Sequence, residues 1–260
     1  MYSKILIANR GAIARRIVRA CHDLSIGSAV VFTEPDQGAP YLSEAGEAHL
    51  IAGLSPADSY MNTEQLLKVA KEVGADAIHP GYGFLSENAD FAKQVRSAGM
   101  HFIGPSPDWI ERMADKVEAR KLMKSAGVPT FPGSGQITNE KEAREFVSEN
   151  GLPVIVKPSG GGGGIGMKVV FDESELGEAI SNASDMAEKS FSNGSVYLER
   201  WMADSRHIEF QILADLDGNV MHLFERDCSV QRRNQKLIEE APAFGIDRAD
   251  CENLADRLVG

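Results

Sequence analysis

Hydrophobic and polar positions along the first hundred residues follow two alternating periods. Short apolar runs predict buried strands at Lys4–Ala8, Ser28–Thr33, Ala75–Ile78 and His101–Ile103. Amphipathic stretches between them predict helices at residues 13–21, Thr63–Glu72 and Glu87–Ala98. Repeated β-α-β order is typical of a parallel sheet covered by helices, with ligands at the carboxyl ends of its strands. The loop from His79 to Asn88 lies at that edge, and Ser86 or Asn88 is expected to cap the next helix.

The pattern changes near residue 130, after a mostly helical stretch from Ser106 to Gly127, and this change marks a candidate domain boundary. A smaller unit follows, with strands predicted at Pro153–Lys157, Met167–Phe171 and Val196–Glu199 and a helix at Asn139–Glu149. A further helix is expected to start at Asp172, because Asp172 and Glu175 have the spacing of a capping box.

From His207 onward, polar and apolar residues alternate strictly, which predicts a strand. Asp217-Gly218 predicts a hairpin turn, Val220–Phe224 the returning strand, and residues 248–259 a last helix. His207, Glu209 and Gln211 share one face of the first strand. That face is either solvated or lines a cleft, and the pattern alone favours neither.

Composition and charge narrow the classes of protein. The 260 residues include 27 Lys and Arg against 38 Asp and Glu, a net charge of −11 that argues against a nucleic-acid surface. The apolar runs are too short to span a membrane, and the N-terminus carries no secretory signal. Cys21, Cys228 and Cys251 form no paired motif, so we expect a cytoplasmic protein and a structural role for Cys228.

Five consecutive glycines, 160–164, stand between two predicted strands. Consecutive glycines expose backbone N–H groups, so this segment predicts a hairpin loop that folds over phosphates; a flexible linker is the alternative. No Gly-Lys-Ser/Thr closes the run, which excludes a Walker loop. The first strand turn also lacks G-x-G-x-x-G, which argues against a dinucleotide-dependent oxidoreductase.

Several charged residues are placed to bind an anionic nucleotide. Lys157 ends a strand beside the glycines and Lys116 opens a helix, so together they could hold a triphosphate, although either alone would usually be a surface charge. The segment from Glu199 to Met202 suits an adenine slot or an ordinary strand end. The segment 225–236 gathers four cations in an acidic chain, as an anion site or a solvated loop: Arg226, Arg232, Arg233 and Lys236.

Taken in order, these motifs resemble the biotin carboxylase component of biotin-dependent carboxylases, an ATP-grasp enzyme. The residues that carry the resemblance are ILIANRG-x-IA, HPGYGFLSEN, FIGP, DK-x-x-AR, the lysine and glycine run, ERDCS-x-QRR-x-QK and EEAPA. The resemblance covers the whole chain. It implies an α/β fold with a Rossmann-like domain over 1–115, a linker helix and ATP-grasp lid over 116–202, and the start of an incomplete C-terminal ATP-grasp subdomain over 203–260.

The resemblance also implies a reaction, in which ATP phosphorylates bicarbonate to carboxyphosphate and the carboxyl group passes to biotin. Lys116, Lys157, Gly163 and Gly164 would bind phosphates, and Glu199, Arg200, Trp201 and Met202 would hold adenine. His207, Gln231 and Asn234 would lie near the ribose and adjoining phosphates, and the catalytic Lys236 would meet bicarbonate. The implied partners are a biotin carboxyl carrier, a carboxyltransferase and a second copy of the chain.

Departures from the family pattern qualify these expectations. Ala12 stands where Glu is usual, Ile165 where a basic residue is common, and Asn234 where His is usual. Nothing in the sequence matches the family's Mg²⁺-binding glutamates or general base, which would follow Gly260. We therefore expect the 260-residue chain to bind nucleotide weakly at best and not to turn over. The alternatives are another ATP-grasp ligase, similar to carbamoyl-phosphate synthetase, and a non-catalytic nucleotide-binding module.

Overall fold

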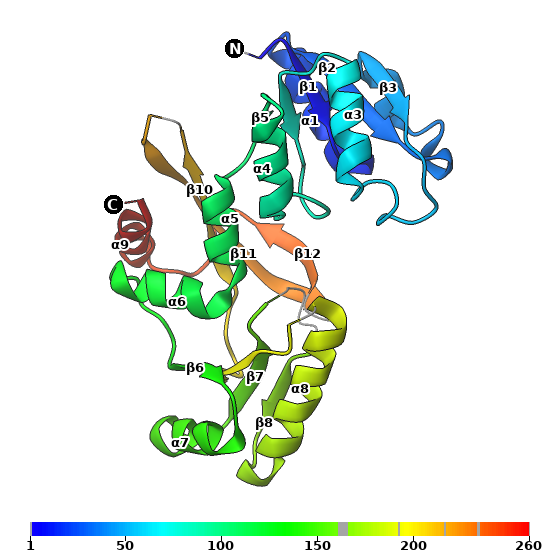
Figure 1. Cartoon of the computed structure of the whole chain (residues 1–260). Coiled ribbons are helices and arrows are strands. Elements are labelled where there is room, and N and C mark those ends of the chain that lie inside the picture. The colour runs from blue at the N-terminus through cyan, green and yellow to red at the C-terminus, as the bar shows by residue number, and fades with distance from the viewer. Residues whose placement is uncertain (1, 161–165, 192, 216, 233–234, 260) are drawn as a thin grey trace. The chain divides into compact units, whose positions relative to one another are not determined.

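The computed structural model describes residues 2–160, 166–191, 193–215, 217–232 and 235–259 (Figure 1). The chain divides into two compact units, Met1–Met113 and Ala114–Gly260.

A five-stranded parallel sheet forms the centre of the first unit. Its strands are β1 (Lys4–Ile7), β2 (Gly27–Phe32), β3 (Glu47–Leu50), β4 (Ala77–His79) and β5 (His101–Phe102). Its helices are α1 (Gly11–Asp23), η1 (Glu34–Asp36), α2 (Pro40–Glu44), α3 (Thr63–Glu72), α4 (Ala89–Ser97) and α5 (Pro107–Ala114). The strand order β3-β2-β1-β4-β5 is that of a Rossmann sheet, which confirms the predicted α/β class.

Both faces of this sheet are buried because successive side chains of β1 point to opposite faces. Leu6 packs in one apolar cluster with residues of α3 and α4. Ile5 and Ile7 pack in a second cluster with residues of α1 and α2. Helices therefore cover both faces, and the polar groups that follow the strands are left at the carboxyl edge.

The loop that follows β4 is tied to the end of β1. The buried side-chain amide of Asn9 donates to the carbonyl oxygens of Pro80 and Tyr82, both at 2.8 Å. Gly81 has φ +69°, and a Cβ there would lie 2.7 Å from the Asn9 amide nitrogen, so only glycine fits. Asn88 caps α4 by accepting the Phe91 N–H at 2.8 Å, as its position in the sequence predicts.

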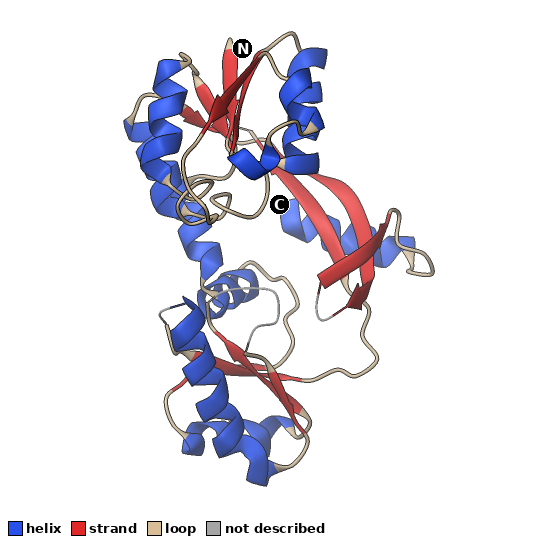
Figure 2. Ribbon diagram, turned by 90° about the vertical axis from the view of Figure 1, so that its right-hand side faces the viewer, coloured by secondary structure: helices blue, strands red, loops and turns tan. Residues whose placement is uncertain are grey.

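The second unit contains two antiparallel sheets (Figure 2). Its strands are β6 (Gly133–Ile137), β7 (Val154–Pro158), β8 (Lys168–Val170), β9 (Val196–Arg200), β10 (Ile208–Ala214), β11 (Val220–Arg232) and β12 (Gln235–Glu240). Its helices are α6 (Lys116–Ser125), α7 (Glu140–Asn150), η2 (Glu173–Glu175), α8 (Leu176–Phe191) and α9 (Arg248–Val259).

The first of these sheets, called here the lid sheet, has the order β6-β9-β7-β8, and α7 and α8 pack on one of its faces. Val154, Val156 and Leu198 belong to the apolar cluster on that face. Strand alternation therefore turns Lys157 and Glu199 to the opposite face. The two-residue period of the strands thus separates the packing face from the charged face of β7 and β9.

The second sheet, β10-β11-β12, is held to α9 by one buried carboxylate. Glu225 of β11 is 1% exposed, and it accepts a hydrogen bond from Arg248 at the start of α9 (Nη2 to Oε2, 3.2 Å) and another from the Ala243 N–H (3.2 Å). Cys251 and Ala255 are the buried residues of α9.

Several predicted elements differ from the structure. The bounds predicted for α3 and α9 are confirmed, and β7 and β8 form the predicted antiparallel pair around the glycine run. Asp172 is a helix cap as predicted, but it caps the 3₁₀ helix η2 by accepting the Ser174 N–H (2.9 Å), and the α-helix α8 begins only at Leu176. The strands β3, β6 and β12 were not predicted: EAHL is polar at alternate positions, GSGQI carries two glycines, and QKLIEE is mostly polar. The returning strand predicted to end at Phe224 continues in β11 to Arg232.

No helix in the described part of the chain is long and apolar enough to cross a membrane.

The buried carboxylate of Glu225 gives a test of what holds α9 in place. Its hydrogen bond from Arg248 lowers the pKa of Glu225 below its ordinary value of 4.5, against the opposing effect of burial. A carboxyl group whose pKa is lower in the folded state stabilises the protein at pH values above its ordinary pKa. That stabilisation is lost as the pH falls through the folded-state pKa. We expect Glu225→Gln to lower the free energy of unfolding by about 1–3 kcal/mol at pH 7 and to flatten its dependence on pH below about 4.5.

Urea unfolding followed by circular dichroism from pH 3 to 7 measures both effects. Glu252→Gln, which changes an exposed carboxylate on the same helix, is the matched control. Equal stability of Glu225→Gln and the control at pH 7 would contradict the assignment.

Candidate functional site

The carboxylate of Glu199 lies between two cations on the face of the lid sheet that α7 and α8 leave open. Lys157 on β7 pairs through Nζ with Oε2 of Glu199. Arg120 on α6 approaches from the other side, with Nη1 2.5 Å from Oε1 of Glu199. The side chain of Glu199 is 15% exposed. The register pairs Ile155 with Glu199, so Lys157 is the diagonal cross-strand neighbour of Glu199. Lys157 was expected to reach the glycine run, and in the structure its ammonium lies on Glu199.

Lys116 is held at the start of α6, next to the end of β7. Asp115 caps α6 by accepting the N–H groups of Val117 (2.8 Å) and Glu118 (3.1 Å). The Lys116 N–H donates to the carbonyl of Ser159 at 3.0 Å, and Ser159 directly precedes the glycine run. The structure therefore brings Lys116 to the same strand end as Lys157. Gly163, Gly164 and Ile165 lie outside the described residues.

The backbone of the candidate adenine slot is already partly engaged. The Arg200 N–H donates to the Pro132 carbonyl and the Trp201 N–H to the Pro153 carbonyl, both at 3.0 Å. These two donors are therefore not available to a base. Met202 follows them at the strand end, and its side chain is about half exposed, at 48%.

A second carboxylate, Glu209 on β10, gathers the cations of the neighbouring strands. Arg226 on β11 lies directly opposite it in the register and pairs with Oε1, and Lys236 on β12 pairs with Oε2. His207 Nε2 lies 3.6 Å from Oε2 of Glu209. Gln231 Nε2 is 2.9 Å from His207 Nδ1. Two residues of the polar face predicted from strand alternation thus meet side chains of the basic segment: Glu209 pairs with Arg226 and Lys236, and His207 contacts Gln231, while His207 and Gln211 are exposed.

These contacts set the charge states of the cluster. Burial alone would raise the pKa of Glu209, but the hydrogen bond from Lys236 and the charge of Arg226 outweigh it and lower that pKa below its ordinary value. The hydrogen bond to Glu209 raises the pKa of Lys236, so its side chain stays an ammonium at neutral pH. One donor of Arg226, the buried Nε, has no hydrogen-bond partner within the residues described. Asn234 lies outside those residues.

Three potential metal ligands meet beside this cluster, in Glu209, Cys228 and Glu239, whose ligand atoms all lie within 4.8 Å of one another. The set does not suit Mg²⁺, which prefers oxygen ligands and ordered water. Burial raises the pKa of the Cys228 thiol, which therefore stays protonated. Glu209 is already compensated by Arg226 and Lys236, and Glu239 lies 3.5 Å from Arg226. The carboxylates of this cluster therefore serve as counter-ions for Arg226 and Lys236, not as metal ligands.

Arg120 and Glu209 are the charged groups whose place in this arrangement the sequence did not predict. Arg120 ends the DK-x-x-AR motif and Glu209 lies on the predicted polar face, so each had a signal. Glu209 is 27 residues from Lys236 and Arg120 is 79 residues from Glu199, and only folding identifies these partners.

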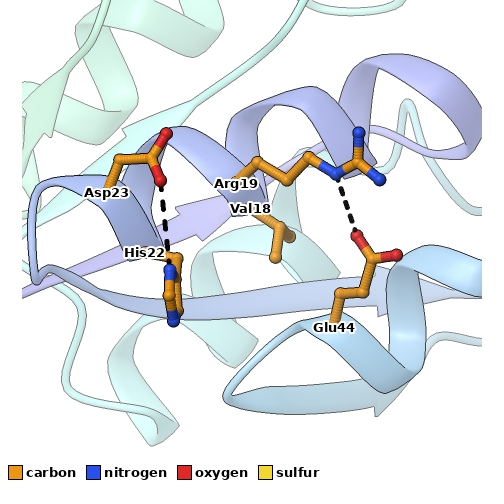
Figure 3. A pocket seen from close by; sticks show the side chains of 5 residues that line it. All are labelled: Val18, Arg19, His22, Asp23 and Glu44. Carbon is orange, nitrogen blue, oxygen red and sulfur yellow. Dashed lines mark hydrogen bonds and ion pairs between the residues drawn. The ribbon is translucent and has the colours of Figure 1, made fainter.

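The first unit has a hollow of about 290 Å³ lined by Val18, Arg19, His22, Asp23 and Glu44 (Figure 3). Its charged groups face one another, with Arg19 Nε 3.3 Å from Glu44 Oε2 and His22 Nδ1 4.0 Å from Asp23 Oδ1. None of the residues expected to bind nucleotide lies there.

Both units match known protein families. Residues 1–110 match the biotin carboxylase N-terminal domain. Residues 115–259 match the ATP-binding domain of the carbamoyl-phosphate synthase L chain. A Rossmann-like unit followed by the lid sheet and a second antiparallel sheet, with these two family matches, defines an ATP-grasp protein. The chain belongs to the family of that ATP-binding domain, and its N-terminal unit matches the N-terminal domain of biotin carboxylase, in agreement with the resemblance that its motifs carry.

Individual relatives agree. The chain is 50% identical over 248 residues to biotin carboxylase 2 of Bacillus subtilis, a match that covers 95% of the chain and 56% of the relative. It is 47% identical over 260 residues to the biotin carboxylase of Halalkalibacterium halodurans, covering 100% of the chain and 58% of the relative. Human mitochondrial pyruvate carboxylase is 49% identical over 246 residues, which cover 94% of the chain and 21% of the relative. The chain therefore spans little more than half the length of these biotin carboxylases, and about a fifth of the pyruvate carboxylase.

Solved structures give the same result. The biotin carboxylase of Campylobacter jejuni, solved as a β,γ-ATP complex, has 41% identity and a TM-score of 0.97 over 100% of this chain and 58% of that one. The biotin carboxylase domain dimer of Hydrogenobacter thermophilus 2-oxoglutarate carboxylase was solved with MgADP, ADP and bicarbonate. It has 46% identity and a TM-score of 0.95 over 100% of this chain and 57% of that one.

The reactivity of the cysteines tests whether their thiols are only packed in the interior or have a functional role. Cys21, Cys228 and Cys251 are all free and buried, and burial raises the pKa of each thiol. Because the thiolate is the reactive form, we expect no fast reaction of the native protein with Ellman's reagent at pH 8, and three thiols per chain in guanidinium chloride. Absorbance at the wavelength of the released dye measures both. Fast native reaction of one thiol, abolished by Cys228→Ser, would make Cys228 a functional group instead.

Proposed function

We propose that this chain forms the nucleotide- and bicarbonate-binding part of a biotin carboxylase. In the proposed reaction, an oxygen of bicarbonate attacks the γ-phosphorus of ATP and the bond to ADP breaks, which gives carboxyphosphate. The carboxyl group then passes to a ureido nitrogen of biotin as its bond to phosphate breaks, and the released phosphate takes up the ureido proton. The observation that carries the proposal is the presence of a biotin carboxylase N-terminal domain directly before an ATP-binding domain in one chain. That combination favours a biotin carboxylase over another ATP-grasp ligase.

The proposed domains are the Rossmann-like domain at 1–115, the linker helix and lid at 116–202, and the start of the C-terminal ATP-grasp subdomain at 203–260. Within the lid, Lys116 and Lys157 would hold phosphates, with Gly163 and Gly164 over them. The hydrogen bond from the Lys116 N–H to Ser159 supports this, because it fixes one lysine beside the end of the strand that carries the other. Two ammonium groups at one strand end stabilise a polyphosphate by charge and position.

The adenine ring would lie at residues 199–202, where Glu199, Arg200, Trp201 and Met202 end β9. Because the N–H groups of Arg200 and Trp201 are engaged within the lid, the Met202 N–H is the donor we propose for the base edge. Of the three N–H groups at residues 200–202, the proposal therefore assigns hydrogen bonding with the base to Met202.

His207, Gln231 and Asn234 would lie near the ribose and adjoining phosphates, and Lys236 is the proposed catalytic residue. Lys236 would hold bicarbonate and then carboxyphosphate as a fixed positive charge, since its raised pKa prevents it from acting as a base at neutral pH. The reaction is then positioning and charge stabilisation of phosphoryl transfer. The described carboxylates do not form an Mg²⁺ site, so we derive no step through the metal.

The carrier and assembly follow from the same assignment. The biotin substrate would arrive on a carboxyl carrier, with a carboxyltransferase as the next component, and the chain would form a homodimer like the Hydrogenobacter domain. Three free buried thiols suit a reducing compartment, and we propose the cytoplasm.

Nucleotide binding is the first test, because it needs only this chain. A ligand that binds only the folded state raises the melting temperature, so ADP at ten times its Kd is expected to raise it by about 3–5 °C. Lys157→Met should reduce this shift, and Lys189→Met, which removes a lysine of α8, is the control. Scanning fluorimetry with ADP, ATP and NADH measures it. Stabilisation by NADH and not by ADP would overturn the proposal.

Turnover is the second test, and it separates binding from chemistry at Lys236. In a version extended to the length of the relatives, Lys236→Ala is expected to lower bicarbonate-dependent ATP cleavage about a hundredfold or more, because it removes a charge used in the transition state. The Kd for ADP should stay within about threefold of wild type. Coupled assay of ADP release, with and without biotin, gives the rate. Equal losses in rate and ADP affinity would reassign Lys236 to nucleotide binding.

A further inference from the structure

The guanidinium of Arg120 lies where α6, the entry to the lid and β9 meet. Nη1 is 2.5 Å from Oε1 of Glu199, and Nη2 donates to the carbonyl of Phe131. The Arg120 side chain is 22% exposed, so it is mostly withdrawn from water. A Cβ at Gly133 would lie 2.7 Å from Cζ of Arg120, so a side chain at residue 133 would displace the guanidinium from this position.

The cations around Glu199 outnumber the carboxylate, so the group can attract an anionic ligand. One carboxylate faces two cations, Arg120 and Lys157, and the side chains of all three are less than a third exposed. These three groups together therefore carry one net positive charge in a partly desolvated place, where charges act more strongly than in water. An anion beside Lys157 would balance it.

Without Arg120 the balance changes. Glu199 would then have Lys157 as its partner in this cluster, and the pair would be neutral. A phosphate that approached Lys157 would compete with the carboxylate for the same ammonium and leave Glu199 partly buried without a counter-charge. Loss of one partner from a desolvated pair is costly, so the lysine would stay on the carboxylate.

We propose that Arg120 is a positioning residue for nucleotide binding. It neutralises Glu199, so that the Lys157 ammonium can leave this carboxylate and bind a phosphate. The inference rests on the proposed role of Lys157 in nucleotide binding. Arg120 itself does not contact the phosphate, and it acts through the charge of Glu199 alone.

A double-mutant cycle tests the inference, with the Kd for ADP measured by isothermal titration calorimetry at fixed ionic strength. Arg120→Met is expected to weaken ADP binding about tenfold, since Lys157 stays on Glu199. In the Glu199→Gln background the same substitution should change the Kd by less than about threefold, because no carboxylate remains to retain the lysine. A packing role for Arg120 would not show this rescue.

Two further variants separate charge from fold. Lys121→Met removes the next charge of α6, which is 65% exposed, and should leave the Kd within about twofold of wild type. Arg120→Lys keeps the positive charge and one donor group and should bind ADP within about threefold of wild type. If Arg120→Met melts more than about 10 °C below wild type, Arg120→Gln, which removes the charge but keeps N–H donors, and its double variant with Glu199→Gln replace it in the cycle, with the same rescue expected.

The outcomes are distinct. Absence of ADP binding by the wild-type chain would refute the proposed function and this inference together. ADP binding that is equally strong in Arg120→Met, or a loss that is the same with Glu199 and with Gln at that position, would overturn the inference and leave the proposed function standing.

Discussion

In each of the two charged clusters of the second unit, a carboxylate lies between two cations. The arrangement of the charged residues depends on this neutralisation of positive charge by a carboxylate. Glu199 lies between Lys157 and Arg120, and Glu209 lies between Lys236 and Arg226. Cations that gather in one place repel one another when no anion lies between them. A carboxylate between each pair offsets this repulsion. The Glu199 group keeps one net positive charge, whereas Glu239 also faces Arg226 in the Glu209 group and balances the second cation there.

The Glu199 group also shows that a chain with a net charge of −11 can hold a local group of charges that is net positive. The excess of acidic residues over the whole chain says little about a cluster in which two cations share one carboxylate. Partial burial strengthens the electrostatic interactions within the cluster, because water and salt screen partly buried charges less than exposed ones. Net charge therefore excluded a nucleic-acid surface without excluding a phosphate site.

Sheet geometry places the two clusters. On β7 and β9, Val154, Val156 and Leu198 face the helices, and Lys157 and Glu199 take the other face by alternation. On β10 and β11, antiparallel register puts Glu209 opposite Arg226. In the first unit, Asn9 ties the Pro80–Tyr82 loop to the end of β1, so that the carboxyl edge of the Rossmann-like sheet is itself held by hydrogen bonds. Each arrangement follows from strand pairing and from a few polar groups at strand ends.

The sequence by itself determined the α/β class, the strands of the parallel sheet apart from the polar edge strand β3, the helices α3 and α9, and the family, because these depend on local periodicity and on residues close in the chain. It also named Lys116, Lys157 and Lys236 as candidates. Only the tertiary structure decided which carboxylate each cation meets: Glu199 is 79 residues from Arg120 and Glu209 is 27 from Lys236. Ion pairing acts over a few ångströms in space, whatever the separation in sequence, so strand register and helix packing must be formed before the partners are fixed.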